Sequence, residues 1–268
     1  MNNEKLISTI LKTVIFFIGW AILISFTPDI QTHNQAFLRL WWEFSPLVVV
    51  VLLSVIFVFV VEKGKVKIPL ASRIFKNSLI GIVLGILWLG SVVAVLLLTK
   101  TMNIQSQNDI DYIWIWILAS LFNVVMQEFL VRGYLYQLWK QKYNRILATV
   151  LTTILFTAMH GGAFEAGIIP VLNIVLMSIF ITLLLEYTGT IVAPIIVHFI
   201  WNTIGAIILG GVSLAGDYPN LINSTFLGDS LISGGVYRIE GSIVVLIVNL
   251  ILITYLLILS KRMSNINI

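Results

Sequence analysis

Eight apolar stretches, separated by short polar segments, constrain this chain more than any other feature. The stretches fall near residues 7–27, 44–61, 79–99, 112–139, 146–160, 167–186, 190–210 and 241–259. A helix needs about 17–25 residues to cross a lipid bilayer, and most of the stretches have this length. We therefore predict an all-α fold: a polytopic membrane helix bundle with about eight transmembrane helices.

The composition leaves little material for a separate soluble domain. Of the 268 residues, 59% are hydrophobic and only 10% are charged, whereas soluble domains have about 25% charged residues. We predict a single membrane domain over 1–268, with a catalytic-type core at about 112–210. The chain has no cysteine, which excludes disulfides, thiolate chemistry and a zinc site built on cysteine. No basic stripe lies on an exposed domain, so we expect no nucleic-acid partner.

Basic residues alternate between the connecting segments. Segments 62–78 and 140–145 and the C-terminal tail are rich in lysine and arginine, whereas 28–43, 100–111 and 211–240 each contain one basic residue. By the positive-inside rule, the rich segments and both termini are cytoplasmic. We expect the long segment 211–240 to be a plain connector.

Polar side chains that can do chemistry lie inside three of the predicted spans: they are Glu128, Arg132, His160, His198 and Asn202. An ionised group in hydrocarbon costs at least about 2.5–3.5 kcal/mol on insertion scales, so such residues are rare and usually functional. Glu128 and Arg132 are four residues apart, as are His198 and Asn202, so each pair shares a helix face. At about 1.5 Å per residue, four of these groups lie roughly 12–22 Å from the cytoplasmic helix ends. The predicted spans place no other carboxylate so deep, and we predict one shared site.

Each group also has a structural interpretation on its own. A lone histidine in a membrane is often a packing residue, and Glu128 with Arg132 could be an ion pair that supports its helix. Asn202 could bond two helices together. A proton relay in a transporter would use the same carboxylate and imidazoles. The chain shows no convincing internal repeat, however, and transporters are often built from duplicated halves.

Together the five groups suit the hydrolysis of an amide bond by water. The carboxylate of Glu128 can act as a general base, with Arg132 keeping it ionised and oriented, and an imidazole can share the water. A second imidazole and an amide can donate hydrogen bonds to a developing oxyanion. Neither the Glu128–Arg132 nor the His198–Asn202 segment contains serine or threonine. A covalent nucleophile is therefore not indicated.

Metal-activated water is an option that the residues leave open. No cofactor is certain, but Glu128, His160 and His198 could hold zinc with one open position. These ligands would come from three helices, and the chain has no His-Glu-x-x-His run. An asparagine one helical turn from His198 favours an oxyanion role over pure metal ligation.

Three motifs carried by these residues resemble those of a known family of intramembrane endopeptidases. The motifs read Gln127-Glu128-Phe129-Leu130-Val131-Arg132, Phe156-Thr157-Ala158-Met159-His160 and His198-Phe199-Ile200-Trp201-Asn202. In this order they resemble the Glu-Glu-x-x-x-Arg, Phe-x-x-x-His and His-x-x-x-Asn motifs of the CPBP family. This family comprises the CAAX proteases and bacteriocin-processing enzymes, also called the Abi family. The resemblance covers about 127–202 and implies an intramembrane (metallo)protease.

The resemblance also implies substrates and a location. Eukaryotic members cleave prenylated CAAX-type proteins near the C-terminus, and bacterial members act in peptide maturation, bacteriocin self-immunity or cell-surface roles. A short chain rich in asparagine and isoleucine is similar to the bacterial branch. We therefore expect a protein of the bacterial plasma membrane, in contact with the lipid bilayer and a membrane-associated peptide or protein substrate. The oligomeric state is open, and the spacing of Gly81 and Gly85 predicts close helix packing within the monomer.

One position departs from the family pattern. Gln127 stands where the family usually has its first glutamate, the residue commonly assigned as the water activator, and glutamine cannot accept a proton at neutral pH. Three interpretations follow. Glu128 takes over as the base, or the chain is a non-catalytic scaffold or bacteriocin immunity protein, or Gln127 is an engineered substitution that traps an inactive form.

Overall fold

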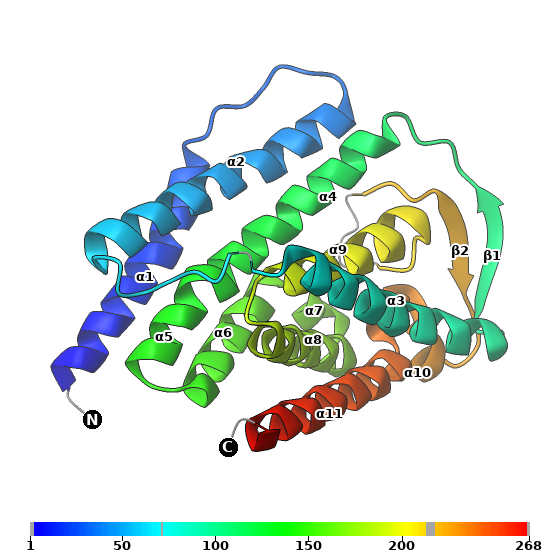
Figure 1. Cartoon of the computed structure of the whole chain (residues 1–268). Helices are drawn as coiled ribbons and strands as arrows, with labels where there is room; N and C mark the ends of the chain where they lie inside the picture. The colour runs from blue at the N-terminus through cyan, green and yellow to red at the C-terminus, as the bar shows by residue number, and fades with distance from the viewer. Residues whose placement is uncertain (1–2, 71, 213–217, 267–268) are drawn as a thin grey trace. The chain divides into compact units, whose positions relative to one another are not determined.

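A computed structural model describes the chain apart from residues 1–2, 71, 213–217 and 267–268. Its longer helices are, in chain order, α1 (Asn3–Ser25), α2 (Gln35–Ile56), α3 (Ile74–Leu98), α4 (Ile113–Glu128), α5 (Tyr136–Lys142), α6 (Arg145–Met159), α8 (Ile168–Thr188), α9 (Val192–Asn202) and α11 (Ile243–Ile266). Short helices are α7 (Gly162–Ala166), α10 (Ser230–Ser233) and the 3-10 turns η4 (Gly235–Tyr237) and η5 (Ile239–Gly241). Three π-helical segments are η1 (Phe57–Val61), η2 (Phe129–Leu135) and η3 (Thr203–Ile208). The two strands are β1 (Met102–Gln107) and β2 (Ile222–Phe226) (Figure 1).

Six helical stretches in the described part of the chain are long and apolar enough to cross a membrane. They are Asn3–Ser25, Gln35–Val61, Ile74–Leu98, Ile113–Lys142, Ile168–Thr188 and Ile243–Lys261. Two shorter apolar helices, Arg145–Met159 and Val192–Ile208, lie where the fifth and seventh spans were predicted. The all-α membrane bundle is confirmed, whereas a count of eight transmembrane helices is not.

Contacts within the chain group its residues into two compact units. The first unit contains Met1–Leu70 and Tyr112–Thr152, and the second contains Ala71–Asp111 and Thr153–Ile268. The boundary after Thr152 falls within α6. A single membrane domain over the whole chain stays a prediction.

In the first unit, α2 runs alongside α4, and α1 packs against α2 (Figure 1). The sequence predicted a span that starts at 44, but α2 begins at Gln35. The reason is the cap: the Asn34 side chain accepts hydrogen bonds from the backbone N–H groups of Ala36 (2.9 Å) and Phe37 (3.3 Å). Asparagine is among the best residues for this position. The cap therefore adds a polar stretch to the helix that hydropathy assigned to a loop.

The first unit is also closed by aromatic and ionic contacts. The rings of Phe16 and Tyr134 lie 4.5 Å apart, and Phe57 contacts both rings edge-on. The buried Glu62 carboxylate pairs with Lys12 at 2.5 Å and with Lys142 at 3.5 Å. These contacts tie α1 and η1 to the end of the Ile113–Lys142 span.

In the second unit, α3 packs closely on α9. A Cβ atom added to Gly81 would lie 2.9 Å from Cβ of Ile196, and one added to Gly85 would lie 2.8 Å from Cδ1 of Ile200. Only glycine permits this approach, so the predicted close packing within the monomer is confirmed. Beyond these glycines, the buried Trp88 ring of α3 stacks on Trp201 of α9, with centroids 4.0 Å apart.

The second unit contains a feature that the sequence analysis missed. Strands β1 and β2 form an antiparallel pair with a bulge between Ile104 and Ser106. They lie in the segments 100–111 and 211–240, which we expected to be loops. The strands have five or six mostly polar residues, and β1 buries only Met102. They therefore lack the alternation of apolar residues by which a strand is recognised.

Candidate active site

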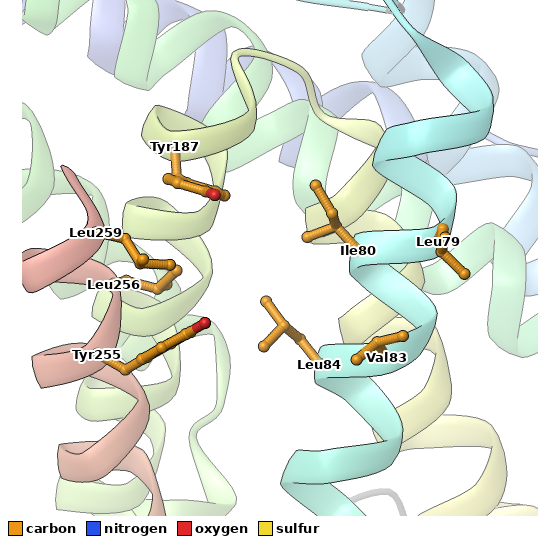
Figure 2. Close-up of a pocket in the computed structure, with 8 residues that line it drawn as sticks. All are labelled: Leu79, Ile80, Val83, Leu84, Tyr187, Tyr255, Leu256 and Leu259. Carbon is orange, nitrogen blue, oxygen red and sulfur yellow. The ribbon is translucent and has the colours of Figure 1, made fainter. Parts of the chain in front are cut away.

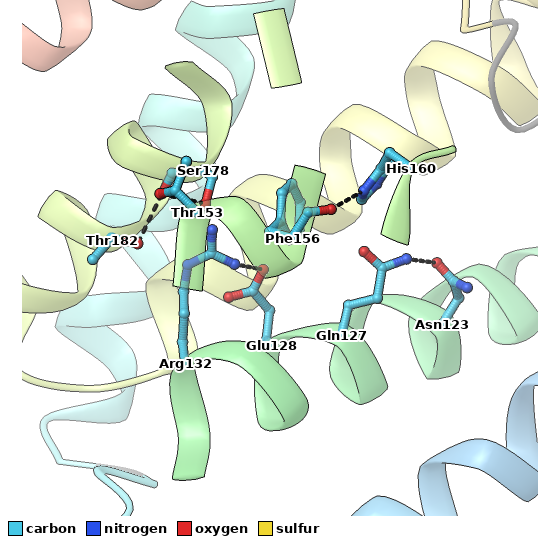
Figure 3. Close-up of polar contacts among 9 residues, drawn as sticks. All are labelled: Asn123, Gln127, Glu128, Arg132, Thr153, Phe156, His160, Ser178 and Thr182. Atoms are coloured by element: carbon cyan, nitrogen blue, oxygen red, sulfur yellow. Dashed lines mark hydrogen bonds and ion pairs between the residues drawn. The ribbon is translucent and has the colours of Figure 1, made fainter. Parts of the chain in front are cut away.

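A fully buried ion pair forms the centre of the first motif. Nη1 of Arg132 lies 2.8 Å from Oε1 of Glu128, and both side chains are 0% exposed. Glu128 is the last residue of α4, and Arg132 follows one turn later in the π-helical segment η2. Figure 3 shows the two side chains turned toward each other. The ion pair predicted from the four-residue spacing is therefore present, and π-helical turns are frequent at functional sites.

This ion pair explains how two charges are tolerated in the interior. Each charge alone would lose its hydration on burial, and their mutual attraction offsets part of that cost. The guanidinium also donates a charge-assisted hydrogen bond to the carboxylate, which fixes its rotamer. Glu128 is thus a carboxyl group whose orientation is fixed by Arg132.

A second polar chain lies beside this pair, and the sequence analysis missed most of it. Nε2 of Gln127 donates to Oδ1 of Asn123 at 2.8 Å (Figure 3). Nδ2 of Asn123 donates to Oε2 of Glu43 at 2.8 Å. The other oxygen of Glu43 pairs with Nη2 of Arg39 at 2.6 Å. All of these residues lie on α2 and α4, within the first unit.

Glu43 corrects the expectation that Glu128 is the only deeply placed carboxylate. Its side chain is 7% exposed, and it belongs to the Gln35–Val61 span, roughly 12 Å from the start of α2 at Gln35. Hydropathy had assigned residues 28–43, and so Glu43, to a loop between two spans. The four-residue spacing of Arg39 and Glu43 was the signal that could have identified this pair.

In the second unit, His160 follows the last residue of α6. Its Nδ1 lies 2.7 Å from the backbone oxygen of Phe156 (Figure 3). A carbonyl oxygen only accepts hydrogen bonds, so Nδ1 carries the proton, and Nε2 is the acceptor when the ring is neutral. This tautomer leaves Nε2 with the lone pair that a general base needs.

The second unit brings two of the predicted residues to one aromatic ring. The Phe156 ring lies 4.5 Å from the ring of His160 and 5.9 Å from the ring of His198. His198 is buried on α9, and Asn202 is the last residue of that helix, directly before the π-helical segment η3. The second and third motifs are therefore connected through the phenylalanine of the second.

Hydroxyl groups hold the end of α6 that carries Phe156. Oγ1 of Thr153 and Oγ of Ser178 are hydrogen-bonded at 3.1 Å, and Oγ1 of Thr182 donates to the backbone oxygen of Ser178 at 2.8 Å (Figure 3). All three residues are buried. The Thr153–Ser178 bond fastens α6 to α8 within the second unit, one turn before Phe156, whereas the Thr182 bond lies within α8.

The predicted site residues are divided between the two units. Gln127, Glu128 and Arg132 belong to the first, and His160, His198 and Asn202 belong to the second. Each group has the internal arrangement described above. One shared site made from both groups stays a prediction.

A cavity in the second unit is separate from these residues. It has a volume of about 290 Å³ and lies among α3, α8 and α11 (Figure 2). Its lining consists of Leu79, Ile80, Val83, Leu84, Tyr187, Tyr255, Leu256 and Leu259. No residue of the three motifs is among them, so the cavity has no group for the proposed chemistry.

A metal site was one of the predictions from the sequence. Among the described residues, no group of three or more histidine, aspartate or glutamate side chains is placed to hold a metal ion. The carboxylate of Glu128 is paired with a guanidinium, which competes with a cation for the same oxygens. Zinc held by Glu128, His160 and His198 stays a prediction, and no step below passes through a metal.

A family of known proteins matches the segment that carries the motifs. The family model described as "Type II CAAX prenyl endopeptidase Rce1-like" matches residues 109–204. This segment contains all three motifs, and the match confirms the resemblance on which the sequence analysis relied. Neither the curated proteins nor the solved structures gave a match.

Proposed function

We propose that this chain, whose segment 109–204 matches a CAAX prenyl endopeptidase family, is an intramembrane endopeptidase that hydrolyses a peptide bond of a membrane-associated protein or peptide. The observation that carries the proposal is that the matched segment includes the motifs of Glu128, His160 and His198 in the family's order. The helical spans support a reaction inside or at the bilayer.

In the proposed reaction, water is the nucleophile. Glu128, held by Arg132, and Nε2 of His160 share the proton that the water loses, and the resulting hydroxide adds to the scissile carbonyl carbon. His198 and Asn202 donate hydrogen bonds to the oxyanion of the tetrahedral intermediate. Collapse of the intermediate breaks the C–N bond, and the leaving amine takes up the proton. The products are a new carboxyl terminus and a new amino terminus.

The proposal includes a location and a substrate class. The chain would lie in a bacterial plasma membrane with both termini cytoplasmic, as the alternation of basic segments indicates. Its substrate would be a CAAX-type protein or a peptide that is matured at the membrane. The lipid bilayer and this substrate are its expected partners, and nucleic acid is not.

A second candidate function has an observation of its own. The side chain at position 127 is an amide, and its N–H groups face Asn123, while Glu128 is fully buried in its ion pair. A chain with this arrangement could serve as a non-catalytic membrane scaffold or bacteriocin immunity protein. In that case a partner would recognise the protein, and no peptide bond would break.

The test compares peptide termini in membranes and culture medium from cells that produce the unmodified chain, Glu128→Ala or Gln127→Glu. We expect new termini with the unmodified chain that are absent with Glu128→Ala. Termini that appear only with Gln127→Glu would mean that the natural chain is inactive but that its fold supports catalysis. Identical termini in all three cultures, with equal amounts of inserted protein, would favour the scaffold function.

A further inference from the structure

The hydrogen-bond chain from Arg39 to Gln127 has a fixed direction. An ionised carboxylate only accepts hydrogen bonds, so Asn123 must turn its amide nitrogen toward Glu43. Its oxygen then faces Gln127, which must in turn donate through Nε2. The charge on Glu43 therefore determines which way the Gln127 amide points, two hydrogen bonds away.

The direction of this chain determines where the carbonyl oxygen of the Gln127 amide points. Its oxygen, Oε1, is buried and has no hydrogen-bond partner among the described residues. Buried acceptors almost always have a donor, and exceptions in native proteins deserve a functional explanation. Gln127 directly precedes Glu128, the carboxylate that we assign to water activation, so an acceptor at this place suits the attacking water.

We propose that Glu43 is a positioning residue of the candidate active site, which acts through Asn123 to hold the Gln127 carbonyl oxygen ready to accept a hydrogen bond from the attacking water. This inference rests on the proposed endopeptidase function. Gln127 orients the water but takes no proton, and Arg39 holds the Glu43 carboxylate by pairing with its other oxygen. An amide suits position 127 because its N–H can donate to the side-chain oxygen of Asn123. The oxygens of an ionised glutamate at this position would be repelled by that oxygen.

Reversing the chain tests the inference. In Gln127→Glu, two acceptors face each other unless Asn123 turns around, and Asn123 then presents its oxygen to Glu43. In the double variant Glu43→Gln, Gln127→Glu, both hydrogen bonds of Asn123 can form again in the opposite direction, with one carboxylate. We expect each single substitution to lower the Tm of the full-length protein in lipid nanodiscs. The Tm of the double variant should be higher than the Tm of the less stable single variant.

A matched control separates this coupling from a simple effect of net charge. Glu62 is another buried carboxylate of the first unit, and it pairs with Lys12 and Lys142 instead. Combining Glu62→Gln with Gln127→Glu makes the same change in charge, and we expect the two Tm shifts to add. If the Tm shifts of Glu43→Gln and Gln127→Glu also add in their double variant, the proposal is overturned.

A kinetic measurement tests the positioning role itself. With a peptide that the unmodified chain cleaves, Glu43→Gln should lower kcat on the order of tenfold to a hundredfold and leave KM unchanged, because it misplaces a group that orients the nucleophile. The double variant should regain most of that loss. An unchanged kcat in Glu43→Gln would overturn the positioning role. If the unmodified chain cleaves nothing, the endopeptidase proposal fails, whereas the melting experiment still decides whether Glu43 controls Gln127.

Discussion

The two groups of motif residues solve the problem of buried polar side chains in different ways. In the first unit, Glu128 and Arg132 are both charged, and each charge compensates the other at 2.8 Å with no exposure. In the second unit, His160 and His198 lie against the ring of Phe156. In the proposed reaction, the first group provides a held carboxylate, whereas the second provides groups that exchange protons and donate hydrogen bonds.

This difference indicates how substitutions should act. A compensated pair of charges is vulnerable in its folding, because removing one partner leaves the other charge buried alone. An imidazole that packs on an aromatic ring can be replaced by another uncharged side chain with less damage to the fold. Loss of stability should therefore dominate in the first group and loss of chemistry in the second.

The largest effect is expected from breaking the charged pair. Arg132→Leu should destabilise the protein by about 3–5 kcal/mol, because the carboxylate of Glu128 stays buried without its guanidinium. Thermal unfolding of the purified protein measures this loss. The double variant Glu128→Leu, Arg132→Leu removes both charges and should be much closer to the unmodified protein. Equal stability of Arg132→Leu and the unmodified chain would contradict the compensation described here.

Replacing His160 tests the other group. His160→Gln should lower the rate of peptide cleavage by about 10²–10⁴-fold, the usual contribution of a general base, while the Tm changes little. His33→Gln is the control, because His33 is exposed in the loop before α2. Cleavage at an unchanged rate by His160→Gln would remove His160 from the proposed reaction.

The close contact between α3 and α9, the helix that carries His198, can be tested with two glycines of α3. Gly81→Ala should cost about 1–3 kcal/mol, since its new Cβ would lie 2.9 Å from Cβ of Ile196 and 3.0 Å from the backbone oxygen of Ala193. Gly90→Ala on the same helix has no atom within 4 Å of its Cβ and should be neutral or slightly stabilising. Chemical denaturation of both variants checks this. Equal effects at the two positions would show that α3 and α9 are not closely packed.

The smallest effect is expected at the start of α2, the helix that carries Glu43. Asn34→Ala removes the side chain that caps two backbone N–H groups and should cost about 0.5–2 kcal/mol. Asn34→Asp retains an acceptor and should keep the stability. The shift in Tm measures both changes. A loss in Asn34→Asp as large as that in Asn34→Ala would mean that the cap does not stabilise α2.

Much of the fold and part of the site could be predicted from the sequence, and the exceptions have physical reasons. Hydropathy located the apolar helices, and the four-residue spacing predicted the contact of Glu128 with Arg132. Hydropathy could not locate the start of α2, because a capping asparagine and a buried pair, Arg39 and Glu43, look like a polar loop. The contact of both histidines with Phe156 depends on how α6 and α9 pack, which spacing along one helix does not reveal.

In the proposed mechanism, the charged and the neutral groups serve one hydrolytic reaction. The most direct test measures the initial rate at which purified protein cleaves its identified peptide, for the unmodified chain, Glu128→Gln, His160→Gln and the double variant. Residues that act as a unit are strongly non-additive. We predict that each single variant loses most of the activity and that the double variant is hardly slower than the slower single one. Losses that multiply, or a single variant at full rate, would contradict a common reaction.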